Sequence, residues 1–187
     1  MYEGGDGVEH SDAKAVSLYQ KACDDGNADG CDKLGFAYGY GNGLGVTKDE
    51  VKGAQFFQKA CDGGDAWGCS NLGLMYLIGL GVPSDGVKSA QLSQKAAQLY
   101  QKACDGGEAW TCVNLGQQYY KGEGVTKDEV KGAQLYQKAC DGGEARGCYF
   151  LAGMYDTGEG VTKDAAKAAQ LYHKACDGGL AAACGKK

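Results

Sequence analysis

Ten cysteines are the residues of this 187-residue chain most able to do chemistry. They form five pairs in which seven residues separate the partners: Cys23/Cys31, Cys61/Cys69, Cys104/Cys112, Cys140/Cys148 and Cys176/Cys184. Strict pairing predicts five disulfides and an oxidising compartment. Buried reduced thiols in a cytosolic protein are the alternative. Zinc fits less well, because structural zinc ligands usually lie about two to four residues apart and only His10 and His173 could assist.

A second candidate for chemistry is the single Ser-x-x-Lys sequence formed by Ser11 and Lys14. In serine β-lactamases this pattern supplies the nucleophile, together with Ser-Asp-Asn and Lys-Thr-Gly elements. Neither companion occurs here, and Ser11 aligns with Asp128 of a later repeat. We therefore interpret the pattern as a repeat position in which serine replaces an acidic residue. The sequence predicts no catalytic residue, no metal site and no cofactor.

Charge and hydropathy exclude two classes of partner. The net charge is −5, whereas nucleic-acid binders carry a basic stripe, so no nucleic-acid partner is expected. No apolar stretch approaches the length of a membrane span, and residues 1–5 do not resemble a signal peptide.

Residues 1–8 align with residues 154–161, so we expect a fragment of a longer array whose export signal lies upstream. Uncapped ends of such an array could associate end to end.

The cysteine pairs recur in a sequence repeat that predicts two helices per unit. The first cysteines of successive pairs lie 38, 43, 36 and 36 residues apart. Cys112, Leu115, Gly116 and Tyr119 have the spacing of one helix face. Residues 126–129 read as a capping box that starts the second helix at Thr126. We expect first (A) helices at 28–40, 66–78, 109–121 and 145–157, and second (B) helices at 11–24, 47–62, 84–105, 127–141 and 163–177.

Two irregularities interrupt the period. Residues 39–45 contain two extra residues, which predicts a longer loop after the helix at 28–40. Residues 89–95 are duplicated as residues 96–102. Seven residues are nearly two helical turns, so the apolar stripe stays in phase and the helix at 84–105 should be about 10 Å longer than its siblings.

These motifs resemble the Sel-1-like repeats, which are related to tetratricopeptide repeats. The resemblance rests on Leu-Gly-x-x-Tyr at 72–76 and 115–119, on Gly-x-Gly-Val at 122–125 and 158–161, and on the Lys-to-Cys motif at 167–176. The cysteine spacing resembles the Helicobacter-type cysteine-rich secreted proteins. The resemblance implies an all-α fold, a right-handed α/α superhelix. It would form one solenoid over residues 1–187, made of a partial repeat 1–27, repeats 28–65, 66–108, 109–144 and 145–180, and the start of another at 181–187.

The resemblance also implies function. Most members act as adaptors for proteins or peptides, here in a secreted or periplasmic setting. Some cysteine-rich members are described as penicillin-binding proteins with weak β-lactamase activity, and a periplasmic immunity or regulatory protein is a further alternative.

The side of the A helices opposite the core face carries the predicted binding residues. They are Trp67, Asn71, Leu74, Ile78, Trp110, Asn114, Gln117, Lys121, Arg146 and Phe150. Aromatic side chains among adaptable polar groups are typical of protein interfaces. We expect this concave face to hold an extended peptide or a partner helix, with Trp67 and Trp110 as anchors and Asn71 and Asn114 bonding backbone. The alternative is that curvature buries these side chains between neighbouring A helices.

Overall fold

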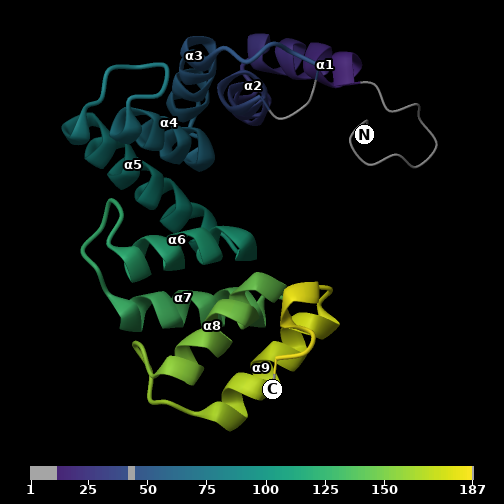
Figure 1. Cartoon of the computed structure of the whole chain (residues 1–187), viewed down its shortest axis with the longest axis vertical. Helices are drawn as coiled ribbons and strands as arrows, with labels where there is room; N and C mark the ends of the chain where they lie inside the picture. The colour runs from purple at the N-terminus through teal and green to yellow at the C-terminus, as the bar shows by residue number, and fades with distance from the viewer. Residues whose placement is uncertain (1–11, 42–44, 187) are drawn as a thin grey trace. The chain divides into compact units, whose positions relative to one another are not determined.

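The computed structural model describes residues 12–41 and 45–186, and this part of the chain contains helices and no strands (Figure 1). His10, Ser11 and the centre of the 39–45 loop lie outside the described residues. The A helices are α2 (Ala28–Tyr40), α4 (Ala66–Ile78), α6 (Ala109–Lys121) and α8 (Ala145–Thr157). The B helices are α1 (Asp12–Asp24), α3 (Glu50–Asp62), α5 (Gly86–Asp105), α7 (Glu129–Asp141) and α9 (Ala165–Asp177). A 3₁₀ turn, η1 (Ala181–Ala183), follows. The predicted all-α fold class and the bounds of all four A helices are confirmed.

The predicted starts of the four B helices after α1 are two to three residues too early, and the capping box at Thr126 is wrong. Helix α7 begins at Glu129, and the carboxylate of Asp128 accepts a hydrogen bond of 2.9 Å from the Lys131 amide. The Asp128 amide in turn donates to the Tyr119 carbonyl of α6 at 2.8 Å. This bond closes the A–B loop, so Thr126 and Lys127 stay outside the helix. Asp49 and Asp164 cap α3 and α9 in the same way.

The chain forms two compact units, Met1–Ala96 and Ala97–Lys187, which are described separately below as unit 1 and unit 2. Unit 1 contains α1–α4 and the first part of α5, and unit 2 contains the rest of α5 and α6–α9. In unit 1 the fully buried ring of Phe57 on α3 lies against Gly35 of α2, where a Cβ atom would collide with the ring. In unit 2 a Cβ atom on Gly116 of α6 would lie 2.7 Å from the Tyr136 ring of α7. In both units a glycine therefore lets the A helix rest directly on a B-helix ring.

A lysine–tyrosine contact joins the two helices within each repeat. The lysine is in the first turn of the B helix, and its ammonium group lies over the ring of a tyrosine near the end of the A helix. The distances to the ring centroid are 3.9 Å for Lys52/Tyr38, 5.0 Å for Lys88/Tyr76, 4.1 Å for Lys131/Tyr119 and 4.4 Å for Lys167/Tyr155. Cation–π attraction of this kind stabilises the helix pair by about 0.5–1 kcal/mol at partly exposed sites.

The predicted lengthening of the B helix at 84–105 is confirmed, because α5 has 20 residues and every other helix of the repeats has 13. The two copies of the duplication serve different units. In the first copy, Leu92 packs on the unit 1 core, and Lys95 lies 3.6 Å from Asp62. In the second copy, Tyr100 meets the Trp110 ring edge-on, with centroids 6.5 Å apart. The boundary between the units, after Ala96, falls one residue into the second copy.

Candidate binding surface

Five disulfides fix the junctions between successive repeats. All five predicted pairs are bonded, with Cα–Cα distances of 4.5–4.9 Å, and this accounts for all ten cysteines. The confirmed bridges are Cys23–Cys31, Cys61–Cys69, Cys104–Cys112, Cys140–Cys148 and Cys176–Cys184. Closing such a short loop stabilises the folded chain by about 2.5 kcal/mol per bridge in the chain-entropy model. Disulfides on this scale indicate folding in an oxidising environment.

The fifth bridge differs from the other four in its surroundings. In the first four bridges, the second cysteine lies in the first turns of an A helix, and both sulfur-bearing residues are buried. These second cysteines are Cys31 on α2, Cys69 on α4, Cys112 on α6 and Cys148 on α8. Cys184 instead directly follows the 3₁₀ turn η1 and is exposed, and its partner Cys176 is half-buried. The expected link from a B helix to the first turn of an A helix therefore holds for four bridges, and the fifth is the one most open to solvent.

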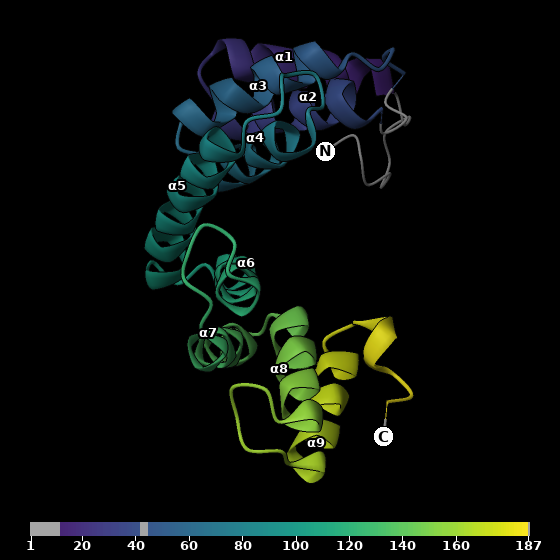
Figure 2. The ribbon, with the colours of Figure 1, turned by 60° about the vertical axis from the view of Figure 1, so that its left-hand side comes forward.

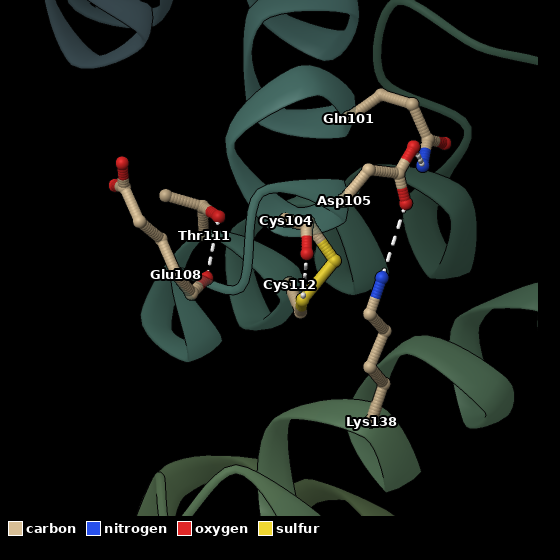
Figure 3. Close-up of polar contacts among 7 residues, drawn as sticks. All are labelled: Gln101, Cys104, Asp105, Glu108, Thr111, Cys112 and Lys138. Atoms are coloured by element: carbon tan, nitrogen blue, oxygen red, sulfur yellow. Dashed lines mark hydrogen bonds and ion pairs between the residues drawn. A yellow bond between two sulfur atoms is a disulfide. The ribbon is translucent and has the colours of Figure 1, made fainter.

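Figure 3 shows one junction, at Cys104 and Cys112, together with the polar contacts on either side of it. Thr111 donates its hydroxyl to the Glu108 carbonyl at 2.6 Å, which closes the first turn of α6 beside the bridge. Trp110 is therefore held on a helix turn that a covalent bond and a hydrogen bond both restrain.

The charged groups near the same junction connect successive B helices. Asp105 accepts hydrogen bonds from Lys138 at 3.0 Å and from Gln101 at 2.9 Å (Figure 3). The bond from Lys138, with that from Gln101, holds the pKa of Asp105 below its usual range. The same lysine-to-aspartate contact joins Lys174 to Asp141, 3.8 Å apart. Because the contact recurs with the repeat, we interpret it as a surface ladder between successive B helices and not as a single functional site.

In unit 1 the predicted binding residues lie on α4 in two environments. Leu74 and Ile78 are exposed at 44% and 59%, and the neighbouring Leu77 is exposed at 58%. Trp67 is half-buried. Asn71 is buried, and its amide donates to the Asp32 carboxylate of α2 at 3.4 Å. The exposed part of this face is therefore apolar, and Asn71 already has a partner inside the protein.

Asp32 is a buried acidic residue that the sequence did not single out. Only 3% of it is exposed. Burial raises its pKa to about 7, and the nearby Asp65 carboxylate adds to the shift. The pKa of Asp65 is itself raised by burial, against the hydrogen bond that it accepts from the Gly68 amide at 2.5 Å. Two carboxylates with raised pKa values thus lie at the packing of α2 against α4.

In unit 2 three of the predicted residues have different surroundings. Trp110 is 37% exposed and packs on Tyr100. Asn114 is buried, at 9% exposure. Arg146 is exposed and forms an ion pair with Glu144, with 3.2 Å between Nε and Oε1. The roles predicted for Trp67, Asn71, Trp110 and Asn114 toward a partner stay predictions.

The remaining three predicted residues come together in one pocket of about 300 Å³. It lies against α8 and α9, which run side by side (Figure 1, Figure 2). Its lining consists of Gln117, Tyr120, Lys121, Tyr136, Tyr149, Phe150, Gly153, Met154, Thr157, Glu159 and Tyr172. The predicted members are Gln117, Lys121 and Phe150. The four tyrosines, Met154 and Glu159 were not predicted.

The tyrosine hydroxyls of this pocket act as hydrogen-bond donors. Tyr120 donates to the Glu159 carboxylate at 2.7 Å, and this bond raises the pKa of Tyr120. Burial, helped by a hydrogen bond to Asp156, raises the pKa of Tyr172 to about 12. Burial also raises the pKa of Tyr136. All three rings therefore stay neutral near pH 7, and the negative charge of the pocket belongs to carboxylates.

Comparison of the repeats explains why the pocket occurs at α8. At the position of Gly153 the other A helices carry Phe36, Leu74 and Gln117. A Cβ atom on Gly153 would meet only the Tyr172 hydroxyl, at 3.8 Å, so the glycine leaves open space. At the preceding turn Phe150 replaces a lysine and two asparagines. Alignment of the repeats therefore contained the signal for the pocket, as a departure from the repeat.

Two kinds of feature are absent from the described residues. In residues 12–41 and 45–186 no three acidic, histidine or cysteine side chains are grouped so that they could hold a metal ion. In the same ranges no helix combines the length and apolar character needed to cross a membrane.

The helix pairs belong to the Sel1 repeat family. The model of the Sel1 repeat matches residues 1–27, 28–65, 68–108, 111–144 and 145–180, which together make up most of the chain. The chain is therefore a Sel1 repeat protein, as its motifs predicted. A search of curated proteins found no match.

Solved structures include similar proteins. The Sel1 repeat protein from Oxalobacter formigenes is 27% identical with a TM-score of 0.68, over 97% of this chain and 69% of that chain. Immunity protein Pa5087 from Pseudomonas aeruginosa is 24% identical with a TM-score of 0.64, over 96% and 63% of the two chains, which is a likeness of fold alone. Cysteine rich protein B from Helicobacter pylori is 33% identical with a TM-score of 0.45, over 76% of this chain and 98% of that chain.

Proposed function

We propose that this chain is a non-catalytic scaffold that binds a protein or peptide through the side of its A helices opposite the core. The observation that carries the proposal is the aromatic pocket of unit 2, which collects Gln117, Lys121 and Phe150 from the predicted face. Exposed Leu74 and Ile78 on α4 support it, because grouped apolar side chains on a soluble surface commonly mark interaction sites. Membership of the Sel1 repeat family agrees with a protein-binding role.

The setting of this scaffold is a secreted or periplasmic one. Five disulfides in a chain of 187 residues support it, because such bonds persist in oxidising compartments.

The catalytic alternative depends on Ser11, which lies outside the described residues. Hydrolysis of nitrocefin by the purified chain, compared with a Ser11→Ala variant, tests it directly. We expect no hydrolysis above that of the variant, since the companion elements of a serine β-lactamase are missing from the sequence.

Selection from a random 12-residue peptide library tests the scaffold function. The oxidised protein is immobilised, and peptides that survive washing are sequenced. We expect a recurring motif, and we expect its binding to weaken in a variant that combines Trp67→Ala with Trp110→Ala. Val130→Ala is the matched control, because Val130 is an exposed apolar side chain on a B helix, at 55% exposure. No enrichment over the bare support would refute the proposal.

The same tryptophan variant separates binding from packing. If the two rings serve a partner, circular dichroism and melting temperature should change little while peptide binding falls. A large loss of stability would show instead that the rings serve the core.

A further inference from the structure

The pocket of unit 2 differs from the rest of the repeat surface because it combines an aromatic wall with unpaired negative charge. We propose that it binds the cationic side chain of an arginine or lysine in an extended segment of a partner protein. This inference rests on the scaffold function proposed above, and it names the side chain that the scaffold recognises.

The aromatic wall is continuous. Phe150 lies between Tyr136 and Tyr149, with ring centroids 5.3 Å and 5.8 Å away, and Tyr149 lies 5.5 Å from Tyr172. Tyr120 adds a fifth ring to the lining. The faces of such rings carry negative charge density and attract a cation within about 6 Å of the ring centre. Tyr120, Tyr149 and Phe150 are only partly buried, so these three rings of the wall can be reached by a positively charged group.

Carboxylates supply the charge. Glu159 lines the pocket and accepts the hydroxyl of Tyr120, and Asp156 accepts that of Tyr172, which forms part of the floor. Within residues 12–41 and 45–186, no lysine or arginine forms an ion pair with Glu159. A carboxylate that neutral hydroxyls orient, without a counter-ion, favours an incoming cation.

Two lysine ammonium groups lie near the pocket, and each is paired elsewhere. Lys121, in the lining, lies 3.7 Å from Glu123. Lys127 lies 2.8 Å from Glu129 and 5.9 Å from the Tyr120 ring centre. Neither lysine forms an ion pair with Glu159, although the Glu159 charge is near enough to contribute to the raised pKa of Lys127. The net charge of −5 also favours encounter with a basic partner.

The size and the depth of the pocket suit one long side chain. Its volume of about 300 Å³ is at the lower end of the range for small-molecule sites. The rings of Tyr136 and Tyr172 at the floor are 3% and 5% exposed, whereas Tyr120, Tyr149 and Phe150 are half-buried. A methylene stem can lie along these outer rings while its charged end reaches the carboxylate. An aliphatic side chain in the same place would cover the Glu159 carboxylate without supplying a counter-ion, which is costly.

The test uses two small probes that differ in charge and hardly in shape. N-acetyl-arginine amide and its neutral analogue N-acetyl-citrulline amide are titrated into the oxidised chain, and NMR shifts of α8 and the tyrosine rings report binding. We expect the arginine probe to bind about tenfold more tightly than the citrulline probe. Equal affinities would overturn the proposal.

Gly153→Gln closes the pocket by restoring the residue that α6 carries at this position, Gln117. The added Cβ atom has room, and glutamine is a better helix former than glycine, so the melting temperature should stay equal or rise. We expect the arginine probe to lose its shifts in this variant. Retained shifts in a folded variant would contradict the assigned pocket.

Glu159→Gln removes the charge without closing the pocket, because the glutamine oxygen can still accept from Tyr120. Affinity for the arginine probe should fall toward that for citrulline, because only the aromatic rings and Asp156 then favour the cation, and affinity for citrulline should not change. Asp141→Asn makes the same change of net charge outside the lining and should leave both affinities unaltered.

These results are distinguishable from those of the peptide selection. If the enriched peptides lack a basic residue and bind the Gly153→Gln variant as tightly as the native chain, the cation pocket is refuted and the scaffold function is not. Binding of the arginine probe without any enriched peptide would support the pocket and refute the scaffold function.

Discussion

The buried Asp32 should make unit 1 less stable as the pH rises. Its pKa in the folded chain is about 7, against an ordinary value of 3.8, chiefly because burial penalises the charged form. Between these two values the folded chain holds the Asp32 proton more tightly than the unfolded chain does. The free energy of unfolding therefore falls as the pH rises through this window, and the loss is complete above about pH 7.

The structure sets the size of this effect. A shift from 3.8 to about 7 is about 3 pH units, and each unit corresponds to about 1.36 kcal/mol, so ionised Asp32 costs up to about 4 kcal/mol. Asp32→Asn removes the ionisable group and keeps an oxygen that can accept from Asn71. We expect this variant to match the native chain near pH 4 and to be more stable at pH 8.

Amide hydrogen exchange of peptides from α2 and α4 is the appropriate assay, because it reports on unit 1 by itself. After correction for intrinsic rates, these peptides should exchange up to about a thousandfold more slowly in Asp32→Asn than in the native chain at pH 8. Peptides from α6–α8 serve as the internal reference.

Asp29→Asn is the matched control, because Asp29 lies on the same helix and its side chain is 69% exposed. Its charge is the smallest of the contributions that raise the pKa of Asp32, so Asp29→Asn should leave protection unchanged at pH 4 and increase it far less than Asp32→Asn at pH 8. If Asp32→Asn gave no added protection at pH 8, or the same gain at pH 4 and pH 8, the assignment of a raised pKa to Asp32 would be refuted.

Three further predictions concern the repeat. The double variant Cys104→Ser, Cys112→Ser should unfold about 2.5 kcal/mol more easily and contain four bridges instead of five by peptide mapping; an unchanged melting temperature would contradict the stabilising role of the bridge. Lys131→Met keeps the stem but removes both the cation at the Tyr119 ring and its 2.6 Å hydrogen bond to the Tyr119 hydroxyl; it should cost about 1 kcal/mol in urea unfolding, and no loss would exclude a stabilising role for this contact. Deletion of residues 89–95 restores a 36-residue step and should leave a folded chain with all five bridges, whereas mispaired cysteines would refute the described register.

The A helices could be predicted to the residue because local signals mark both ends. Glycine follows each of them, and at α6 the Gly122 cap has a left-handed backbone with φ of 78° and donates to the Gln118 carbonyl. The B helices were predicted to start too early because Thr126 and Asp128 are both good cap residues. The hydrogen bond from the Asp128 amide to Tyr119 decides between them, and that bond depends on packing between two helices.

The disulfides could be predicted completely because each pair is a local feature of the sequence. The surroundings of the bridges could not be predicted. Cys184 is exposed because it follows the η1 turn, whereas the equivalent Cys148 is buried on α8. The same spacing of eight residues therefore serves a helix start in one place and a short turn in another.

The pocket could be predicted only in part for a similar reason. Gln117 and Lys121 lie on one face of α6 and Phe150 lies on the equivalent face of α8, so the 3.6-residue period finds them. Glu159 lies in the loop after α8, and Tyr172 lies on α9. Their convergence with α6 and α8 follows from tertiary packing, which no local period encodes. Gly153 was recognisable, because it interrupts a run of large side chains at one repeat position.

The spacing of the disulfides has a consequence for biosynthesis. Ten cysteines can pair in about nine hundred ways, yet every native partner lies only eight residues away, whereas the nearest cysteine of a neighbouring pair is at least 28 residues away. Loop-closure entropy then favours the native partner about sixfold over that neighbour, even in the unfolded chain. Each bridge can therefore close as soon as its own two cysteines enter an oxidising compartment, so correct oxidation does not have to wait for the rest of the polypeptide.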